Sequence, residues 1–253
     1  MGWEVRQGDG LELIRELPDC SVDMVFTDPP YGYNNNNGDL INRREAVLGR
    51  LPSDSDKSQV ADARPIANDG PEANELFKAI LPEIKRVLKP DCCCCCSGGG
   101  GPDPQFARWS LWLDEVLTFK QMVVWDKGPM GMGWHYRRSY ETVLVAHKGQ
   151  KCRWYDDSNR VENVIRDVPK IIPQADEHPT PKPIALAKRF IQYHTLPGDL
   201  VLDPFCGGGS TLEAAVSMGR EALGFEIDPC WADYSRIRLE TVTPSLWGQG
   251  GVE

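Results

Sequence analysis

The chain lacks any long apolar run and any excess of positive charge. No stretch approaches the roughly 18 apolar residues of a membrane-spanning helix, and residues 1–6 lack a charged region followed by an apolar one. We therefore expect a soluble, intracellular protein without a signal peptide. The net charge of -9 does not indicate nucleic-acid binding, so any polyanion would have to bind a local basic surface. At 253 residues, the chain is long enough for one domain with a full core.

Metal-binding cysteine patterns are also missing. Five of the nine cysteines are consecutive, from Cys92 to Cys96, and alternate residues of an extended run face opposite ways, so the run cannot surround one ion. No Cys-x-x-Cys pair outside the run supports a zinc site. We interpret the run as a buried strand and expect no metal ion. The other cysteines are scattered, and free thiols fit a reducing compartment: Cys20, Cys152, Cys206 and Cys230.

Strand-like and helix-like segments alternate along the chain. Apolar and β-branched segments predict strands at residues 3–7, 22–27, 92–96, 121–125, 141–147, 200–202 and 221–227. Helical spacing predicts helices at residues 11–17, 72–88, 104–119, 183–193, 212–218 and 229–239. This alternation predicts an α/β fold with a doubly wound, mostly parallel sheet. The polar residues 33–70 are too long for a connector, so we expect a functional loop or a partly disordered insertion.

The first motif is the turn Asp28-Pro29-Pro30-Tyr31, directly after the predicted strand 22–27. Two prolines cannot donate to a sheet ladder, so the chain must leave the sheet in a rigid, extended turn. The turn places a carboxylate, the Pro29 carbonyl and an aromatic ring at the carboxyl edge of the sheet, where open α/β sheets bind ligands. Two acceptors beside a ring suit a planar group that carries an exocyclic amine. The alternative is an ordinary acidic Pro-Pro turn.

The second motif is Asp203-Pro204-Phe205-Cys206-Gly207-Gly208-Gly209-Ser210-Thr211, between a predicted strand and a predicted helix. Glycines let the backbone approach a ligand closely, and a helix start offers unpaired N–H groups. Asp203 would repel phosphate but attract the cationic amino-acid end of S-adenosylmethionine. Glu226-Ile227-Asp228 ends the next strand, where dinucleotide-binding folds place the acid that binds a ribose diol. The alternative for Glu226 is a solvated strand end.

With a third segment, His178-Pro179-Thr180-Pro181-Lys182-Pro183, the chain resembles the β-class amino DNA methyltransferases, in which Asp-Pro-Pro-Tyr precedes the cofactor-binding segment. The resemblance covers almost the whole chain and is weakest in residues 33–70 and at the C-terminus. It implies one methyltransferase domain over residues 1–253, with a seven-stranded, Rossmann-like sheet and a circularly permuted motif order. It also implies S-adenosyl-L-methionine as cofactor, double-stranded DNA as substrate, and a cytoplasmic protein encoded by a bacterium or a phage.

The resemblance implies a role for each matching residue. The catalytic turn is Asp28, Pro29, Pro30 and Tyr31: the first two hold the target amine, and the tyrosine stacks on the flipped base. Glu226 binds the ribose hydroxyls, and Asp9 meets the adenine amine of the cofactor. The residues implied to bind the cofactor are Asp9, Asp28, Thr180, Lys182, Asp203, Phe205, Gly207, Gly209, Ser210, Glu226 and Ile227.

The chemistry follows from the reacting groups. A ring-conjugated amine is a poor nucleophile and a sulfonium methyl is already activated, so the protein mainly aligns the two and draws the amine hydrogens toward Asp28 and Pro29. In this family Asp before Pro-Pro-Tyr favours adenine N6, and cytosine N4 stays open. An RNA or protein-glutamine amine methyltransferase stays open as well, as does a DNA-binding protein of this fold that has lost catalysis. Cys230 follows the ribose-binding acid at a helix start, so we interpret it as structural.

A basic and aromatic stretch is a candidate DNA-contact surface. Residues 127–170 contain nine Lys and Arg against five acids. The region of about 127–177 is short for target recognition, so we expect the insertion 33–70 to take part in recognition as well. A small recognition region would also fit a homodimer or a relaxed target sequence. The alternative for the basic and aromatic stretch 127–170 is a solvated loop. The residues expected to contact DNA are Arg43, Arg44, Arg137, Arg138, Lys151 and Arg153. The biological role stays open among restriction-modification, regulation and phage self-protection.

Overall fold

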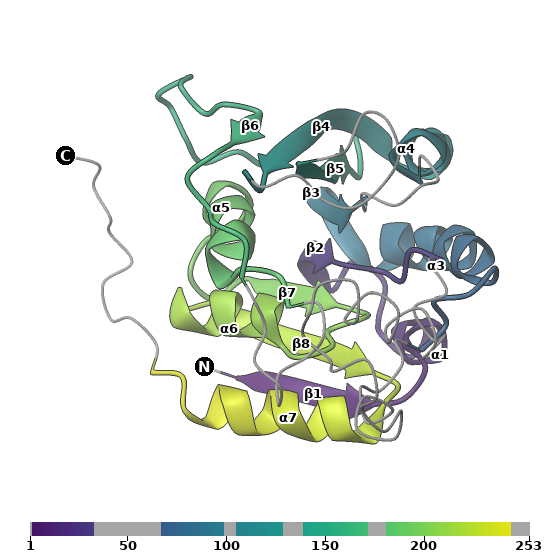
Figure 1. Cartoon of the computed structure of the whole chain (residues 1–253). Coiled ribbons are helices and arrows are strands. Elements are labelled where there is room, and N and C mark those ends of the chain that lie inside the picture. Colours follow the sequence, from purple (N-terminus) through teal and green to yellow (C-terminus); the bar gives the residue numbers. More distant parts are fainter. Residues whose placement is uncertain (1, 33–66, 99–104, 129–138, 172–180, 244–253) are drawn as a thin grey trace, which may run out of the picture.

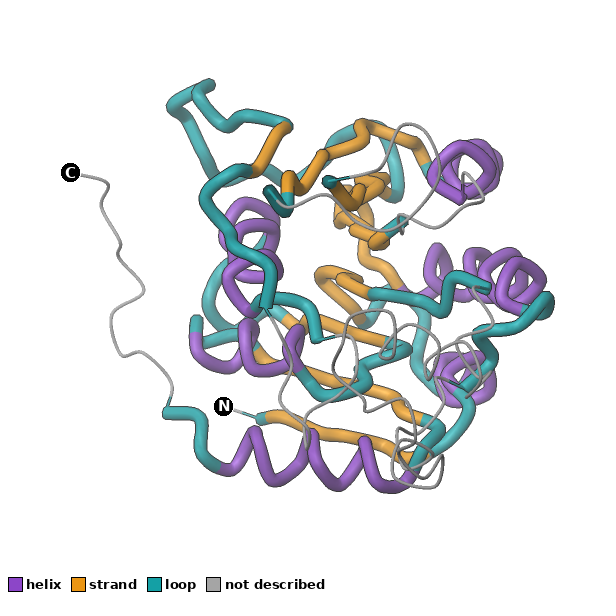
Figure 2. The backbone as a smooth tube through the Cα atoms, viewed as in Figure 1, coloured by secondary structure: helices purple, strands orange, loops and turns teal. Residues whose placement is uncertain are grey.

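The protein is built around one mixed β-sheet, which is covered by helices on both faces. The computed structural model describes residues 2–32, 67–98, 105–128, 139–171 and 181–243 (Figure 2). Its strands follow the order β1-β8-β7-β2-β3-β5-β4-β6 across the sheet. In chain order they are β1 (Trp3–Gln7), β2 (Val22–Thr27), β3 (Leu88–Ser97), β4 (Thr118–Asp126), β5 (Tyr140–His147), β6 (Val164–Ile165), β7 (Leu200–Asp203) and β8 (Glu221–Glu226).

The helices form two layers. One face of the sheet carries α1 (Gly10–Arg15), α3 (Ala73–Val87) and α4 (Gln105–Val116), and the other carries α5 (Ile184–His194), α6 (Ser210–Ser217) and α7 (Pro229–Glu240) (Figure 1). Strands are parallel except at β5, which runs antiparallel to both β3 and β4. The predicted α/β, doubly wound, mostly parallel sheet is therefore confirmed. It has eight strands where seven were expected, because β6 pairs with the edge of β4.

The central strand β2 is buried on both sides because its alternate side chains enter different cores. Met24 and Phe26 pack with residues of α5 and α6, whereas Val25 packs with α1, α3 and α4. The cysteine run in β3 behaves in the same way: Cys94 faces the α3 side and Cys95 the α5 side. All five cysteines of the run are fully buried, which confirms the interpretation of this run as a buried strand.

The parallel strands bring separate motifs to one edge. Gln7 at the end of β1 pairs with Glu226 at the end of β8, and Asp203 at the end of β7 pairs with Gly224 of β8. On its other side β7 pairs with β2, whose last residue is Thr27. The turns after β1, β8, β7 and β2 therefore lie next to one another at the carboxyl edge. Among the described residues, no helix has the length and apolar character needed to cross a membrane.

Candidate active site

The turn after β2 is held in place by two buried polar side chains from elsewhere in the chain. The backbone N–H groups of Tyr31 and Gly32 both donate to Asp69 Oδ1, at 2.9 and 2.8 Å. Gln105 Nε2 donates to the Tyr31 carbonyl at 2.8 Å. Asp69 and Gln105 are only 1% and 2% exposed, so these bonds are shielded from water. The residues that fix the Pro-Pro turn were not identified from the sequence, because nothing local connects them to it.

Asp28 belongs to a chain of charged side chains. Lys182 Nζ donates to Asp28 Oδ2 at 2.6 Å and lies 3.3 Å from Glu141 Oε2. Lys127 Nζ donates to Glu141 Oε1 at 2.7 Å, and the Tyr31 hydroxyl donates to the other Asp28 oxygen. The Lys182 ammonium also lies 5.3 Å from the centre of the Tyr31 ring. Four segments of the chain thus orient the Asp28 carboxylate and the tyrosine ring together.

The ionisation of these groups is set by burial and by their partners. Burial alone would raise the pKa of Glu141, but Lys182 and then Lys127 lower it to about 2. Burial alone would lower the pKa of Lys182, but Asp28 and then Glu141 hold it well above its usual value. Burial, and next the charge of Asp28, raises the pKa of Tyr31. At neutral pH the site therefore contains a lysine cation, a glutamate anion and a phenol that donates a hydrogen bond.

The glycine-rich turn after β7 requires its glycines. Gly207 and Gly209 have φ angles of 48° and 78°, a region that favours glycine. A Cβ at Gly209 would lie 2.9 Å from Ser235 Oγ, and that hydroxyl donates to the Gly207 carbonyl at 2.6 Å. Arg238 Nη1 donates to the Gly208 carbonyl at 2.9 Å. Helix α7 thus holds the turn with two side chains three residues apart, a same-face spacing that the sequence contained and that we did not use.

Glu226 is oriented by backbone donors on both of its carboxylate oxygens. The N–H groups of Gly207 and Asp228 donate to Oε2 and Oε1, each at 2.9 Å. The Glu226 carbonyl accepts the Gly8 N–H at 2.8 Å, which ties β8 to the turn after β1. Burial raises the pKa of this carboxyl. Each oxygen keeps a lone pair for a further donor such as a hydroxyl, and the next residue, Ile227, is 37% exposed.

The turns after β1 and β7 touch each other at a position where only glycine fits. A Cβ at Gly10 would lie 2.3 Å from the Pro204 carbonyl oxygen and 3.3 Å from the Phe205 ring. Gly10 was also missed by the sequence analysis, although it follows Asp9 directly. Asp9 caps α1, because its Oδ1 accepts two N–H groups of the first helical turn at 2.8 and 3.3 Å. Both capping bonds use Oδ1, so among the described residues Oδ2 remains available to a ligand.

Asp203 joins the two motifs. Thr27 Oγ1, at the end of β2, donates to Asp203 Oδ1 at 2.7 Å, and the Phe205 N–H donates to the same oxygen at 3.1 Å. Asp203 is 2% exposed, and burial raises its pKa to about 7. No lysine or arginine of the described residues pairs with it. A ligand with a positive charge would therefore stabilise the ionised form of this carboxyl.

The edge as a whole has a definite chemical character. It combines acidic side chains, a glycine turn with helix α6 behind it, and an aromatic ring, and it provides hydrogen-bond acceptors more than donors. Ser210, the first residue of α6, is nearly buried and its Oγ lies 3.5 Å from Arg238 Nη1. Such an edge suits a ligand with amine and hydroxyl groups and disfavours a phosphate.

Several predicted residues are not placed at this edge. Thr180 and the four arginines Arg43, Arg44, Arg137 and Arg138 lie outside the described residues. Arg153 lies at the opposite, amino edge of the sheet, where its Nη1 donates to Asp23 Oδ1 at 3.0 Å. Lys151 is close by, with its backbone N–H donating to Asp91. That these two residues bind DNA stays a prediction. They lie near the amino end of β2, whereas Asp28 follows its carboxyl end.

Comparisons with known proteins found relatives that align with most of the chain. DNA adenine methyltransferase YhdJ of Escherichia coli K12 is 28% identical over 268 residues, which cover 93% of this chain and 82% of the relative. Type II methyltransferase M2.DpnII of Streptococcus pneumoniae is 28% identical over 247 residues, covering 92% and 87%. The solved structure of TTHA0409 from Thermus thermophilus in complex with S-adenosyl-L-methionine has a TM-score of 0.67 at 22% identity and covers 97% of this chain and 98% of that one.

The family match includes both motifs of the site. Residues 22–236 match the family of N6/N4 DNA methylases, described as DNA methylase. This range begins with the first residue of β2 and extends into α7, so it contains the Asp28 turn, the glycine-rich turn and Glu226. The chain, in short, belongs to the N6/N4 DNA methylase family.

Proposed function

We propose that this protein transfers a methyl group from S-adenosyl-L-methionine to the exocyclic N6 amine of adenine in double-stranded DNA. The observation that carries the proposal is the bond from Thr27 to Asp203. This bond holds the strand end before Asp28 beside the glycine-rich turn, which supports an amine acceptor site and a cofactor edge on one surface. Membership of the DNA methylase family supports methyl transfer to DNA. The name of the Escherichia coli relative supports adenine as the base.

The residues at the carboxyl edge fit the cofactor. Glu226, with both oxygens already oriented by backbone N–H groups, accepts the ribose hydroxyls. Asp203, a buried carboxyl with a raised pKa, matches the positive charge of the methionyl amine. Asp9 Oδ2 is available to the adenine amine, and the exposed Ile227 side chain provides an apolar surface for the ring. When bound, S-adenosyl-L-methionine supplies a methyl group activated by its sulfonium.

The Asp28 turn prepares the amine. Asp28 and the Pro29 carbonyl accept hydrogen bonds from the two amine hydrogens, which localises the nitrogen lone pair and aligns it for direct in-line attack. As the nitrogen gains the methyl group it releases one of these protons, by way of Asp28, to water. A base inside a duplex cannot reach this turn, so the adenine is flipped out and stacks on the Tyr31 ring. Lys182 Nζ holds the Asp28 carboxylate by its hydrogen bond to Oδ2. In this mechanism the chain's residues position and polarise the amine, and no side chain forms a covalent bond to the base.

We also propose how DNA is held. Residues 1–253 form one methyltransferase domain, and the region of about 127–177 and the insertion 33–70 share target recognition. Arg43, Arg44, Arg137 and Arg138 contact phosphates, which an acidic protein needs as a local basic surface. The enzyme acts in the cytoplasm, where bacterial DNA lies. A homodimer would add a second basic surface, and light scattering of the purified protein with and without duplex tests for it.

The proposal is tested with labelled S-adenosyl-L-methionine and duplex DNA, followed by mass spectrometry of the released nucleosides. We expect N6-methyladenine from the wild-type chain. Asp28→Asn should lower the transfer rate about 10²- to 10³-fold, as expected when one preorganised polar contact to the reacting group is lost. Calorimetry with S-adenosyl-L-methionine measures cofactor affinity separately from the transfer rate. Glu115→Gln, at an exposed acid of α4 outside both proposed recognition segments, is the matched control and should keep the wild-type rate.

The outcomes separate the competing functions. N4-methylcytosine as the sole product would move the assignment to cytosine. Cofactor binding without transfer to any DNA would indicate a protein of this fold that has lost catalysis. An Asp28→Asn variant with an unchanged rate would exclude the proposed site altogether.

A further inference from the structure

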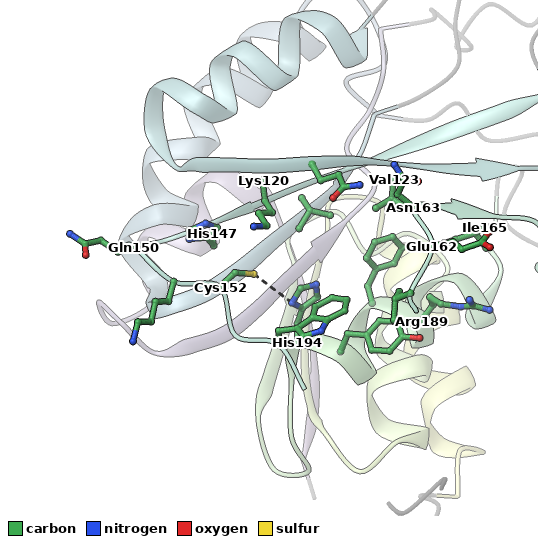
Figure 3. A pocket seen from close by; sticks show the side chains of 17 residues that line it. Lys120, Val123, His147, Gln150, Cys152, Glu162, Asn163, Ile165, Arg189 and His194 are labelled. Carbon is green, nitrogen blue, oxygen red and sulfur yellow. Dashed lines mark hydrogen bonds between the residues drawn. The ribbon is translucent and has the colours of Figure 1, made fainter. Parts of the chain in front are cut away.

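The described part of the chain contains a cavity that lies away from the proposed active site. A cavity of about 660 Å³ lies between β4, β5, α5 and the loop that follows β5. Its walls are mostly apolar and aromatic, and Cys152, His147 and His194 open onto it (Figure 3). Cys93, which pairs with Met24 in the sheet, lies next to Cys152. Since Asp28 is four residues beyond Met24, about 13 Å of strand separates the cluster from the proposed active site.

Two sulfur atoms and one imidazole nitrogen meet at the inner wall of this cavity. Cys93 Sγ lies 2.7 Å from Cys152 Sγ and 3.2 Å from His194 Nδ1. Cys152 Sγ lies 3.8 Å from the same nitrogen, as the dashed line in Figure 3 marks. The three residues come from β3, from the loop after β5 and from the last turn of α5. Cys93 is fully buried, whereas Cys152 is half-buried and lines the cavity.

The protonation of the cluster follows from its neighbours. His194 Nδ1 lies 2.8 Å from the carbonyl oxygen of Arg153. A carbonyl only accepts, so Nδ1 carries a hydrogen and can share it with the nearby sulfurs. The bond from Cys93, and then the contact with His194, lowers the pKa of Cys152 to about 5. The same bond and burial raise the pKa of Cys93. Cys152 is half-buried and lines the cavity beside the His194 N–H, whereas Cys93 is fully buried, so the thiolate of the pair forms more readily on Cys152 and Cys93 is the thiol that donates to it.

We propose that Cys93 and Cys152 are a peroxide-sensitive thiol pair that forms a reversible disulfide. The Cys152 thiolate attacks one oxygen of a small peroxide that enters the cavity; an S–O bond forms, the O–O bond breaks, and hydroxide leaves. Cys93 sulfur then attacks Cys152 sulfur; the S–S bond forms, the S–O bond breaks, and the hydroxyl group leaves as water with the proton of Cys93. The pair loses two electrons, and hydrogen peroxide is reduced to one water and one hydroxide, which takes a proton from the solvent to become the second water.

The geometry favours this chemistry over a metal site. The ligand atoms of Cys93, Cys152 and His194 lie within 4.8 Å of one another, as a soft metal ion would require. A metal ligand, however, must present a free lone pair, and His194 Nδ1 uses its hydrogen to bond the Arg153 carbonyl. The cluster also offers only three ligands among the described residues. A nucleophilic thiolate with a partner thiol in contact has what disulfide formation needs.

The test counts free thiols in the full-length protein and does not depend on methyl transfer. The reduced chain is treated with a small excess of hydrogen peroxide, denatured in acid, alkylated with N-ethylmaleimide and weighed intact. We expect the number of alkylated cysteines to fall from nine to seven, and dithiothreitol to restore the original count. Digestion with pepsin should yield a linked peptide that contains Cys152 and part of the β3 run.

Single variants assign the roles. Cys93→Ser should stop at a sulfenic acid on Cys152, which dimedone labels, and Cys152→Ser should keep all of its remaining thiols. Cys230→Ser removes an exposed cysteine outside the cluster and should still lose two thiols. Loss of two thiols in Cys152→Ser, no loss in the wild type, or one stoichiometric zinc ion bound in the purified protein would each overturn the proposal. If a variant fails to fold, the wild-type chain alone tests the proposal: the linked peptide after peroxide treatment supports it, and the absence of that peptide overturns it.

Discussion

The two ends of strand β2 each carry an aspartate, and the two aspartates differ in what surrounds them. Asp23, at the amino edge, bonds to Lys89 at 2.7 Å, to Arg153 at 3.0 Å and to the Leu200 N–H at 3.0 Å. Burial alone would raise its pKa, but these partners together lower it. Asp28, at the carboxyl edge, has one ammonium partner among the described residues, and its side chain is more exposed than that of Asp23. The amino-edge carboxylate is saturated, whereas the carboxyl-edge one can still accept a ligand.

The comparison extends to the other acids of the carboxyl edge. Burial raises the pKa of Asp203 to about 7 and also raises that of Glu226, since no protein cation among the described residues compensates either carboxyl. Buried acids are ordinarily paired within a fold. Acids that remain unpaired at one edge carry a free-energy cost that a cationic or hydroxyl-bearing ligand relieves. The difference between the edges therefore distinguishes structural carboxylates from ligand-binding ones.

The largest effect should come from neutralising the buried carboxyl of the carboxyl edge. The pKa of Asp203 is raised in the folded state, so its contribution to stability is present below about pH 4 and is lost as the pH rises through about 7. Asp203→Asn should therefore gain stability relative to the wild type between pH 5 and pH 8, by up to about 4 kcal/mol. Chemical denaturation at the two pH values measures the gain, with Asp157→Asn as control. A pH-independent difference would contradict the assignment.

Removing the Asp23 carboxylate should lower the stability of the fold, the opposite of the effect expected for Asp203→Asn. Asp23→Ala leaves the Leu200 N–H and Lys89 without their partner and leaves Arg153 with only its 4.0 Å contact to Asp199. It should lower the free energy of unfolding by about 2–3 kcal/mol, since both cations can still reach water. The loss should be constant from pH 8 to about pH 4 and shrink below it, because the folded-state pKa of Asp23 is lowered. Urea denaturation measures it. An equally large loss in Asp28→Ala would erase the distinction between the edges.

A smaller effect is expected from the cation that orients Asp28. Lys182→Met removes the ion pairs to Asp28 and Glu141, and should slow methyl transfer roughly 10- to 100-fold, the range for a lost charged hydrogen bond. Single-turnover rates at saturating cofactor measure the loss. Lys85→Met, at an exposed lysine of α3, serves as control. A wild-type rate in Lys182→Met would mean that Tyr31 alone is enough to hold Asp28.

The smallest effect concerns Cys230 at the start of α7. Its backbone N–H, not its thiol, bonds the capping Asp228 at 2.8 Å, and its side chain is exposed. Cys230→Ser should change the free energy of unfolding by less than about 0.5 kcal/mol, as is usual for surface sites, and should leave methyl transfer intact. Loss of transfer in a folded Cys230→Ser variant would show that the carboxyl edge uses a nucleophile after all.

Much of the fold was predictable because its elements are local in sequence. The strand boundaries at β1, β2 and β8, and the start of α7, agree with the predicted segments to within a residue or two. Apolar periodicity and proline or glycine at the ends of segments are sufficient for this. The strand β6 was not predicted, because two residues carry no periodicity and pair with β4 only through the fold. The residues that hold the Asp28 turn were missed for a related reason: Asp69 and Gln105 lie far from it in sequence.

The sequence by itself determined which residues could carry the chemistry, because each motif is a strand followed directly by a turn and needs only its neighbours to form. Tertiary structure alone decided which of those residues meet. Lys182 reaches Asp28 across 154 positions, Thr27 reaches Asp203 across 176, and Cys152 reaches Cys93 across 59. Such pairings depend on the order of strands in the sheet and on burial, which set the ionisation of each group, and no local pattern encodes either.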